Sequence, residues 1–509
     1  MGYEEMKKEL LASPEKLMQK KPFYREVYET KGVANCGFLS EQYINETITA
    51  EPTSLKVTPV SQDRFLMELN PDSHDVLFDE NIPSITMKLK NGGWADLKFK
   101  RVAVPFQRLI KNKQVLHATG NPLNHTLLIE NPTETQSDSF ILVKQYWKMR
   151  NQDGMFKKMV ETQKSMGDVG LLYYYDYKGQ IKCRVLSYKD GYAICTHRDN
   201  NGDVILESVV YEKDNVKYID SYDDLYMYRY KNDTNVTKSE EDGWVLEKRV
   251  RHGFDEIPLI SKRGEVAWNA VQSAIDVYEV IYNVFLAIQK KHGWGVLYIK
   301  GNFDENGKKL AGNIILNDNS IDGKGDAKFL TPPSPEHIIE TLQSIEDNIQ
   351  KGAGTTFILP KDIRLSGDIS GIAIALTMSL DIETAEQDRI DWQNVTCKMM
   401  RLFKFGLAKE LYNKDKKKYK SVISDFEDID IYSEIKVWRP MNEYEYNQMI
   451  QMMTQGGVLS FETGTELCTL SKPDEKARLA REEKAEEEKE QRKEEREFQV
   501  KGFTNPQNE

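Results

Sequence analysis

Three closely spaced carboxylates are the residues best suited to metal chemistry. Asp425, Asp428 and Asp430 follow one another within a short polar stretch. Carboxylate oxygens are the ligands that Mg²⁺ prefers, and pairs of such ions serve nucleases and polymerases. The chain is rich in acidic residues, however, and solvated surface carboxylates explain the triplet better than a metal site does. A metal-dependent DNA-processing enzyme is therefore kept as an alternative, and the prediction is that no metal binds.

Other catalytic patterns are incomplete. Gly352-Ala353-Gly354 is half of a dinucleotide-binding fingerprint, but it lacks the third glycine and follows a predicted helix instead of a strand. Ser366 and Ser370 have no histidine partner placed by the sequence and are better explained as turn and helix-cap residues. The cysteines form no C-x-x-C pair and the seven histidines are dispersed, which argues against a zinc site. The sequence predicts no enzyme, no metal site and no cofactor.

The longest regular element predicted lies between Leu365 and Tyr412. It opens on a Ser- and Gly-rich cluster, and apolar residues then recur at helical spacing without an internal proline. As one helix it would measure about 65 Å, against a usual length of about 8–20 residues. A helix of this length needs an equally long surface to pack against.

Strands and shorter helices surround this stretch, which predicts an α+β fold. Short strands are predicted at 54–60, 84–90 and 95–104, and a β meander from Gly170, with turns at Lys178-Gly179, Asp190-Gly191 and Asn201-Gly202. The tyrosines Tyr173, Tyr174, Tyr175 and Tyr177 are expected to be ordinary strand residues with one face buried, although a base-stacking platform is an alternative. Helices are predicted at 106–116, 137–167, 264–293, 335–351, 441–456 and 460–470.

Composition limits the functional class. The 509-residue chain carries 30% charged residues and a net charge of −11, so no general electrostatic hold on nucleic acid is expected. The five scattered cysteines fit a reducing compartment. The sequence has no stretch of eighteen apolar residues, so we expect no membrane span.

Three stretches together resemble a known family. They are KRVAVPFQRLIKNKQVLHATGNPL (100–123), FDEIPLISKRGEVAWNAVQSAIDVYEVIYN (254–283) and the S-G-x-A motif Ser370-Gly371-Ile372-Ala373. A fourth, GGVLSFETGTEL (456–467), precedes an acidic-basic run. In this order, over roughly residues 100 to 490, they resemble the portal (head–tail connector) proteins of tailed bacteriophages.

The resemblance implies an architecture. It divides the chain into a wing (1–263 and 369–440), two stem helices (264–293 and 335–351), a clip (294–334), a tunnel loop (352–368), a helical crown (441–497) and a disordered tail (498–509). The wing contains the β meander and the long helix, and the clip is small and β-rich.

The resemblance also implies a function and partners. The subunits would form a ring, usually a dodecamer, around a channel for double-stranded DNA during packaging and ejection. The ring would sit at the capsid vertex of the virion, after synthesis in the host bacterial cytoplasm. It would dock the terminase large subunit, head-completion or adaptor proteins, and the major capsid and scaffold proteins. A coiled-coil scaffold is a third possibility, weakened by the strand signals before Tyr211.

Two sets of residues are predicted to face the DNA. On the stem helices, carboxylates would keep the channel lining negative so that DNA slides. In and beside the tunnel loop, Lys351, Lys361 and Arg364 could make weak contacts with DNA, although ordinary surface charge also explains them. Phe357 is equally explained as the loop's apolar tip or as packing beneath it. The stem set is Asp276, Glu279, Glu340, Glu346 and Asp347; the loop set is Lys351, Gly352, Thr355, Thr356, Phe357, Lys361 and Arg364.

Overall fold

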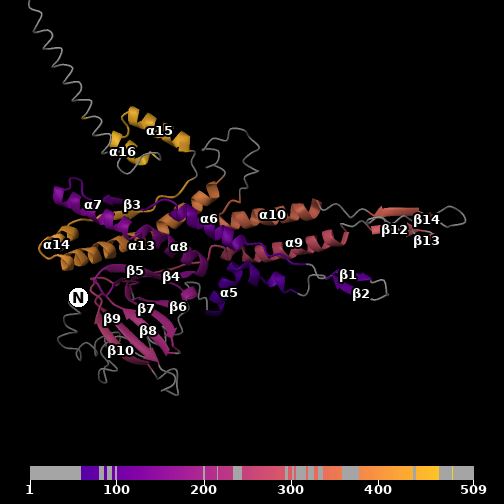
Figure 1. Cartoon of the computed structure of the whole chain (residues 1–509), viewed down its shortest axis with the longest axis horizontal. Coiled ribbons are helices and arrows are strands. Elements are labelled where there is room, and N and C mark those ends of the chain that lie inside the picture. Colours follow the sequence, from indigo (N-terminus) through magenta and orange to yellow (C-terminus); the bar gives the residue numbers. More distant parts are fainter. Residues whose placement is uncertain are drawn as a thin grey trace, which may run out of the picture. The chain divides into compact units, whose positions relative to one another are not determined.

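The computed structural model of the chain consists of helices and antiparallel strands (Figure 1). The structure describes residues 59–79, 85–88, 94–97, 100–198, 201–214, 216–232, 244–292, 296–300, 303–304, 317–318, 326–330, 336–357, 378–439, 443–468 and 484. The chain divides into two units, one of residues 1–357 and 380–438 and one of residues 358–379 and 439–509. Both helix and sheet are abundant, as the α+β prediction requires.

Helices form one layer of the first unit. The longest, α13 (Ser379–Lys414), has 36 residues. Short 3₁₀ turns lie at Pro71–Ser73, Asp75–Leu77, Tyr188–Asp190 and Asn269–Val271. The remaining α-helices of this unit are α5 (Pro59–Leu69), α6 (Phe106–Thr119), α7 (Glu134–Met149), α8 (Gln152–Met166), α9 (Gln272–His292), α10 (Glu336–Ala353) and α14 (Val422–Glu427).

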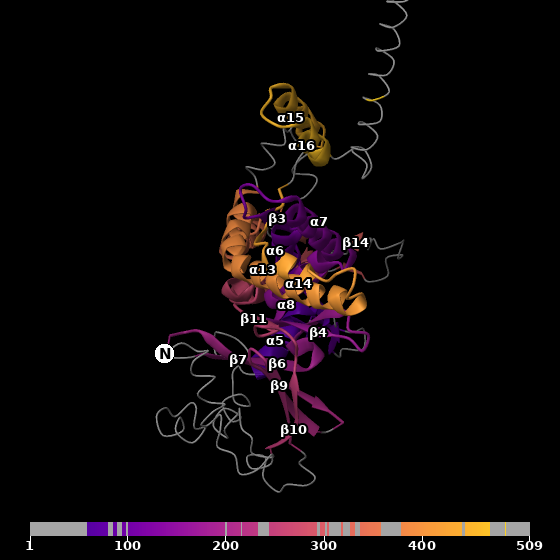
Figure 2. The same cartoon turned by 90° about the vertical axis from the view of Figure 1, so that its left-hand side faces the viewer.

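Two sheets lie on one side of the helical layer. Figures 1 and 2 both show the helices first, then the three-stranded sheet and then the five-stranded sheet. The three-stranded sheet has the order β11 (Leu259–Arg263), β4 (Asp168–Tyr175), β5 (Ile181–Leu186). The five-stranded sheet has the order β10 (Trp244–Arg251), β9 (Tyr226–Asn232), β8 (Val216–Tyr222), β7 (Val204–Lys213), β6 (Tyr192–Arg198).

Four small pairings complete the strands. β3 (Asn124–Leu127) pairs with β16 (Ile431–Glu434), and β1 (Ile85–Lys88) pairs with β2 (Trp94–Leu97). Between α9 and α10, β12 (Val296–Lys300) pairs with β15 (Asp326–Leu330), and β13 (Phe303–Asp304) with β14 (Asn317–Asp318). All of these pairs are antiparallel.

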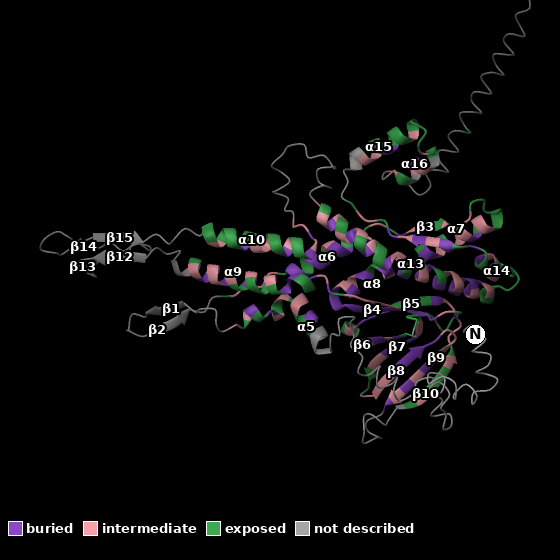
Figure 3. Cartoon of the chain, turned by 180° about the vertical axis from the view of Figure 1, so that it is seen from behind, coloured by how far each residue is buried: buried purple, intermediate pink, exposed green. Residues whose placement is uncertain are grey.

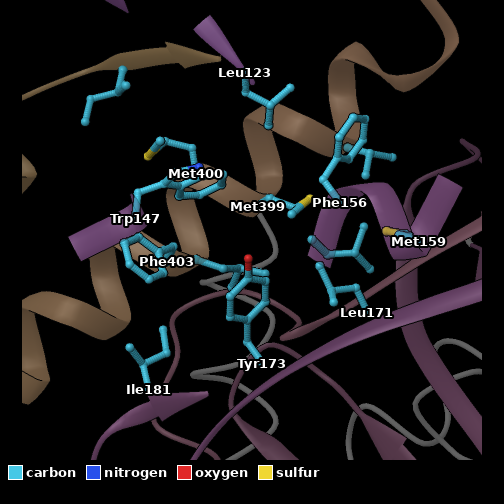
Figure 4. Close-up of a cluster of buried hydrophobic side chains, with 14 of the residues drawn as sticks. Leu123, Trp147, Phe156, Met159, Leu171, Tyr173, Ile181, Met399, Met400 and Phe403 are labelled. Carbon is cyan, nitrogen blue, oxygen red and sulfur yellow. The ribbon is translucent and has the colours of Figure 1, made fainter. Parts of the chain in front are cut away.

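The main core lies between α13 and the three-stranded sheet (Figure 4). Phe403 and Met399 of α13 are fully buried, and the Phe403 ring packs edge-on against Trp147 at 5.3 Å between centroids. Gly406 allows the closest approach, because a Cβ atom there would lie 2.1 Å from Ile181 Cδ1. The Glu410 carboxylate accepts hydrogen bonds from Arg150 Nη2 at 2.6 Å and from the Ile181 backbone N–H at 2.9 Å.

The meander prediction is confirmed, including its turns. Gly179, Gly191 and Gly202 all have positive φ, which glycine adopts without a Cβ clash. Tyr173 is buried, Tyr177 is 91% exposed, and Tyr175 stacks on Phe254 at 5.0 Å between ring centroids. The tyrosines therefore behave as ordinary strand and loop residues.

Three helix predictions need correction. The helix predicted at 137–167 is two helices, α7 and α8, separated at Asn151, whose φ of 50° is left-handed. The helix predicted from Gly264 begins at Gln272, because the Gly264 and Ala267 N–H groups donate to carbonyls of Gly167 and Lys164 instead. The long helix begins at Ser379, and 365–377 lie outside the described residues.

Two strand predictions are also wrong in part. Pro59 and Val60, at the end of the strand predicted at 54–60, open α5, and proline is suited to the first helical position. In 95–104, only the start forms β2, and residues 100–104 make no strand ladder. Their backbone is held by side chains of α9, as described below.

The second unit contains a helical hairpin. α15 (Glu443–Gln455) and α16 (Phe461–Leu467) confirm the helices predicted there. Ser460 caps α16, since its Oγ accepts from the Thr463 N–H at 3.1 Å. Apart from Lys484, the charged run at 473–497 and the predicted tail at 498–509 lie outside the described residues.

Candidate functional site

One narrow stripe of side chains on helix α9 is buried, and two of its four residues are polar. Ile275, Glu279, Asn283 and Ala287 recur every fourth residue and are all buried, so they lie along one helix face. A buried carboxylate or amide is costly unless its hydrogen bonds are satisfied. The partners of Glu279 and Asn283 therefore decide how α9 is held.

Glu279 joins three segments. Its Oε1 accepts a hydrogen bond from the Val104 N–H at 2.6 Å and lies 2.8 Å from His74 Nδ1. The side chains of Glu279 and His74 are both almost fully buried. The other ring nitrogen of His74 lies 2.7 Å from the Glu68 carbonyl oxygen. Burial by itself lowers the pKa of His74, but the hydrogen bond and charge of Glu279, with the Glu68 carbonyl and Asp276, raise it above 6.5 overall.

Asn283 completes the attachment. Its Oδ1 accepts from the Val102 N–H at 2.8 Å, and its Nδ2 donates to the Val102 carbonyl at 2.7 Å. The amide side chain thus pairs with backbone as a strand neighbour would. Together Glu279 and Asn283 fix α9 to the segment that leads into α6.

Helix α10 has one apolar and one acidic face. Leu342, Ile349 and Ala353 are buried, and Ile345 packs against the same cluster as Val271 of the preceding 3₁₀ turn and Ile275 of α9. The opposite face is exposed along most of the helix (Figure 3). It carries Glu336, Glu340, Asp347 and Lys351. Negative charge at the helix start and a lysine in the last turn both suit the helix dipole.

The residues after α10 are clamped between α6 and α13. Gln114 of α6 donates to the Ala353 carbonyl at 2.8 Å, and Phe357 stacks on Phe106 at 5.5 Å between ring centroids. From α13, Thr384 Oγ1 donates to the Gly354 carbonyl at 2.9 Å, and Asp381 Oδ2 accepts from the Thr356 N–H at 3.1 Å. Residues 353–357 and the start of α13 therefore lie together.

The predicted tunnel-loop residues differ in their burial. Lys351 and Gly352 belong to the last turn of α10 and are exposed. Thr355 is fully buried, so the expectation that it faces a channel is wrong. Thr356 and Phe357 are half-buried in the clamp, where Phe357 stacks on Phe106. Lys361 and Arg364 lie outside the described residues.

The predicted stem carboxylates are also separated. Asp276, Glu340 and Asp347 are exposed and Glu346 is half-buried. Glu279 is only 2% exposed, so the prediction that it lines a surface is wrong, because its carboxylate serves Val104 and His74. Asp276 accepts from Gln272 at 2.7 Å, and burial raises its pKa.

His74 and Asn283 were not predicted as site residues. Their partners lie 205 and 181 positions away in the chain, and no local pattern marks such pairs. The one available signal is a polar residue within a helical apolar stripe, which is visible at Glu279 and Asn283.

The alternative chemistry gains no support from the described residues. Among them, no group of three or more His, Cys, Asp or Glu side chains could hold a metal ion. Asp425 accepts a hydrogen bond from Ser421 Oγ at 2.7 Å. One helical segment, Asn269–Gln289, is long and apolar enough to cross a membrane. This segment also carries Glu279 and Asn283, whose side chains are buried and hydrogen-bonded within the chain.

Comparisons with known proteins identify a family. The family model described as "Phage portal protein, SPP1 Gp6-like" matches residues 95–490, which confirms the resemblance drawn from the sequence. No curated protein matches the chain. Two solved structures are similar over 72% of this chain and 90% of theirs: "Neck of empty GTA particle computed with C6 symmetry" (13% identity, TM-score 0.38) and "Neck of native GTA particle computed with C12 symmetry" (14% identity, TM-score 0.33). Scores this low support no structural argument, so the assignment rests on the family match.

The His74–Glu279 pair predicts a pH-dependent stability. Because the pKa of His74 is raised in the folded state, protonation stabilises the fold fully below the unfolded pKa of about 6.5. This contribution is lost as the pH rises through the folded pKa. His74→Gln should therefore lower the free energy of unfolding most at low pH, by about 3–5 kcal/mol for a broken buried pair. Urea unfolding between about pH 5.5 and about pH 9 measures the difference.

His125→Gln is the matched control. Burial lowers the pKa of His125 to about 4, so this histidine is neutral over the same range. The unfolded chain nevertheless takes up a proton on this residue below about pH 6.5, so the substitution should cost less as the pH falls, the opposite of the trend at His74. Equal pH dependence for the two variants would contradict the role assigned to the His74–Glu279 pair.

The clamp after α10 predicts a costly substitution at Gly354. Its φ is +59°, and a Cβ atom there would lie 2.2 Å from Thr384 Oγ1. Gly191 also has a positive φ, +80°, but its Cβ would meet nothing within 4 Å. Gly191→Ala should cost about 1 kcal/mol from backbone strain, and Gly354→Ala about 1–2 kcal/mol more. If both variants lost the same free energy of unfolding, the Thr384 side chain would have moved aside without cost, which would contradict the predicted clash at Gly354.

Proposed function

Because the chain belongs to the SPP1 Gp6-like family of phage portal proteins, we propose that it forms a ring of identical subunits, a dodecamer, at one vertex of the capsid. Double-stranded DNA passes through the ring during packaging and ejection. The family match over residues 95–490 carries this proposal, since it includes α9, α10 and α13. The protein is structural, and the energy for DNA movement comes from a separate motor.

The charge on α10 suits a channel wall. Each lysine or arginine that neutralises a phosphate adds affinity and therefore slows movement. The exposed face of α10 carries Glu336, Glu340 and Asp347 against the single Lys351. In the proposed ring this face, with the exposed Asp276 of α9, lines the stem. The segment 358–377, which follows the clamped residues 353–357, is placed to form the tunnel loop, with Lys361 and Arg364 near DNA.

The apolar surface of α9 suits a contact between subunits. Val277 is 51% exposed and Val280 is 37% exposed, whereas apolar residues on a helix of a monomer usually face its core. Only 28% of the apolar window of this helix is buried within the chain. A neighbouring subunit in the ring would cover it, which also explains a helix of near-membrane hydrophobicity in a ring protein.

The remaining partners follow from the family. The β12–β15 and β13–β14 pairs between α9 and α10 form the clip, where we place docking of the terminase large subunit and of head-completion or adaptor proteins. The major capsid and scaffold proteins would contact the wing around α13. The crown would contain α15 and α16.

The ring is tested by the state of the purified chain. We expect native mass spectrometry and negative-stain images to show closed rings of about twelve copies. Val277→Asp with Val280→Asp should abolish the rings, because it places two charges in the proposed contact. The control, Ile390→Asp, changes an apolar residue of α13 that is 70% exposed and should leave the rings intact. A wild-type chain that stays monomeric under all conditions would refute the proposal.

The channel is tested by reversing its charge. In assembled rings, Glu340→Lys with Asp347→Lys should tighten DNA binding and steepen the slope of log K against log salt by about 0.9 per new phosphate contact, or about 1.8 in total. Fluorescence anisotropy with a short duplex measures both. Asp138→Lys, at an exposed position on α7, is the single-site control and should leave the slope unchanged. An unchanged slope in the double variant would place α10 outside the channel.

A further inference from the structure

The five-stranded sheet has an inner and an outer face with different surroundings. Side chains of a strand alternate between faces, so the register assigns each residue. Thr196 and Glu207 point inward, since both hydrogen-bond Ser261 of β11 in the three-stranded sheet. Ile194 and Val209 belong to the same inner cluster as Leu259. The inner face is therefore packed against the three-stranded sheet.

The outer face is buried as well. Its members are the residues that alternate with the inner ones along β6 to β9, and each is 7% exposed or less: Cys195, His197, Leu206, Ser208, Ile219, Ser221, Tyr228, Tyr230 and Asn232. Figure 3 shows the buried residues along β7 and β8. On a sheet with one face in water, outward residues are mostly polar and keep much of their exposure.

No described element outside this sheet contributes to the outer apolar cluster. The cluster consists of Leu206, Ile219, Tyr228 and Tyr230, with Ile205, Val210, Tyr226 and Leu246 packed against it, all from β7, β8, β9 and β10. Residues of one flat face cannot reduce one another to such low exposure. These exposures are those of the single chain, so the covering material must come from a part of the chain beyond the described residues.

The chemistry of the face defines what it binds. The centre is apolar and aromatic, and the Ser208 and Ser221 hydroxyls hydrogen-bond each other at 2.7 Å. At one side Arg249 lies over the Tyr226 ring at 4.2 Å from the centroid. Such a face suits a polypeptide segment with several aliphatic or aromatic side chains, with Arg249 and Arg251 along its β10 edge.

We propose that residues 1–58 of the same chain cover this outer face. The segment joins the described fold at Pro59 of α5, which lies toward the β6 side of the sheet in Figures 1 and 3. Fully extended it would reach about 190 Å, whereas five strands span only about 20 Å. It contains the apolar groups the face requires, including Phe23, Tyr24, Val27, Tyr28, Phe38, Leu39, Tyr43 and Ile44.

The nearer internal segment fits poorly. Residues 233–243, between β9 and β10, have the sequence DTNVTKSEEDG, in which Val236 is the only apolar residue. It could not cover a cluster that extends over four strands. The N-terminal segment thus acts as a cover of the wing sheet, a role distinct from the stem and the channel.

Photo-crosslinking in the full-length chain tests this directly. A benzoylphenylalanine replacing Tyr226, a half-buried residue of the outer cluster, should crosslink to residues 1–58 of its own chain. The same group at Tyr177, which is 91% exposed, reports the background. Mass spectrometry of a mixture of isotopically light and heavy protein distinguishes the same chain from another copy. Crosslinks to 233–243, to a second copy or to any other part of the chain would overturn the proposal.

Thiol accessibility tests the cover independently. In a variant whose only cysteine is Cys195, deletion of residues 2–50 should raise the rate of labelling by at least about tenfold, since local opening would no longer be needed. Replacing 233–243 by a short Gly-Ser turn should leave the rate unchanged. Circular dichroism checks that both variants are folded. A folded truncated chain that still protects Cys195 would overturn the proposal, and ring formation, measured separately, would not be affected by that result.

Discussion

A helix of 36 residues has to be covered along its whole length, and the rest of the first unit is arranged to do so. Near its start, α13 holds residues 353–357 through Asp381 and Thr384. In its middle, Trp392 packs edge-on against Phe156 of α8. Near its end, Glu410 joins Arg150 and β5. The helix therefore connects the clamp of the candidate loop to the main core, and displacement of one would be felt by the other.

Buried carboxylates fix the directions of these contacts. Glu279 and Glu410 each accept from a backbone N–H and contact a basic side chain from a distant part of the chain. Such pairs gain little net free energy over apolar residues of the same size. They do exclude other arrangements, because an alternative packing would leave the charge buried without partners. This suits a pair of helices that must project from the body at one fixed angle.

Local patterns predicted the elements well and the site only in part. Alternation and glycine turns located β4 to β7, and helical periodicity located α9, α10 and α13, because both signals lie within short windows. The helix break at Asn151 and the late start of α9 were missed, since each depends on hydrogen bonds to distant residues. For the same reason Glu279 and Thr355 were assigned to a surface that they do not reach. Family resemblance supplied the function, which no catalytic pattern could have done.

The carboxylates of α9 and α10 have different surroundings and different roles. On α9 the central carboxylate is turned inward and serves as a structural link, while on α10 Glu340 and Asp347 stay in water. A wall that carries many charges destabilises its own fold only if those charges are buried or crowded. Glu336, Glu340 and Asp347 all lie on one exposed face, where water and salt weaken the repulsion of the i,i+4 pair Glu336 and Glu340. A negative surface is then compatible with a stable helix.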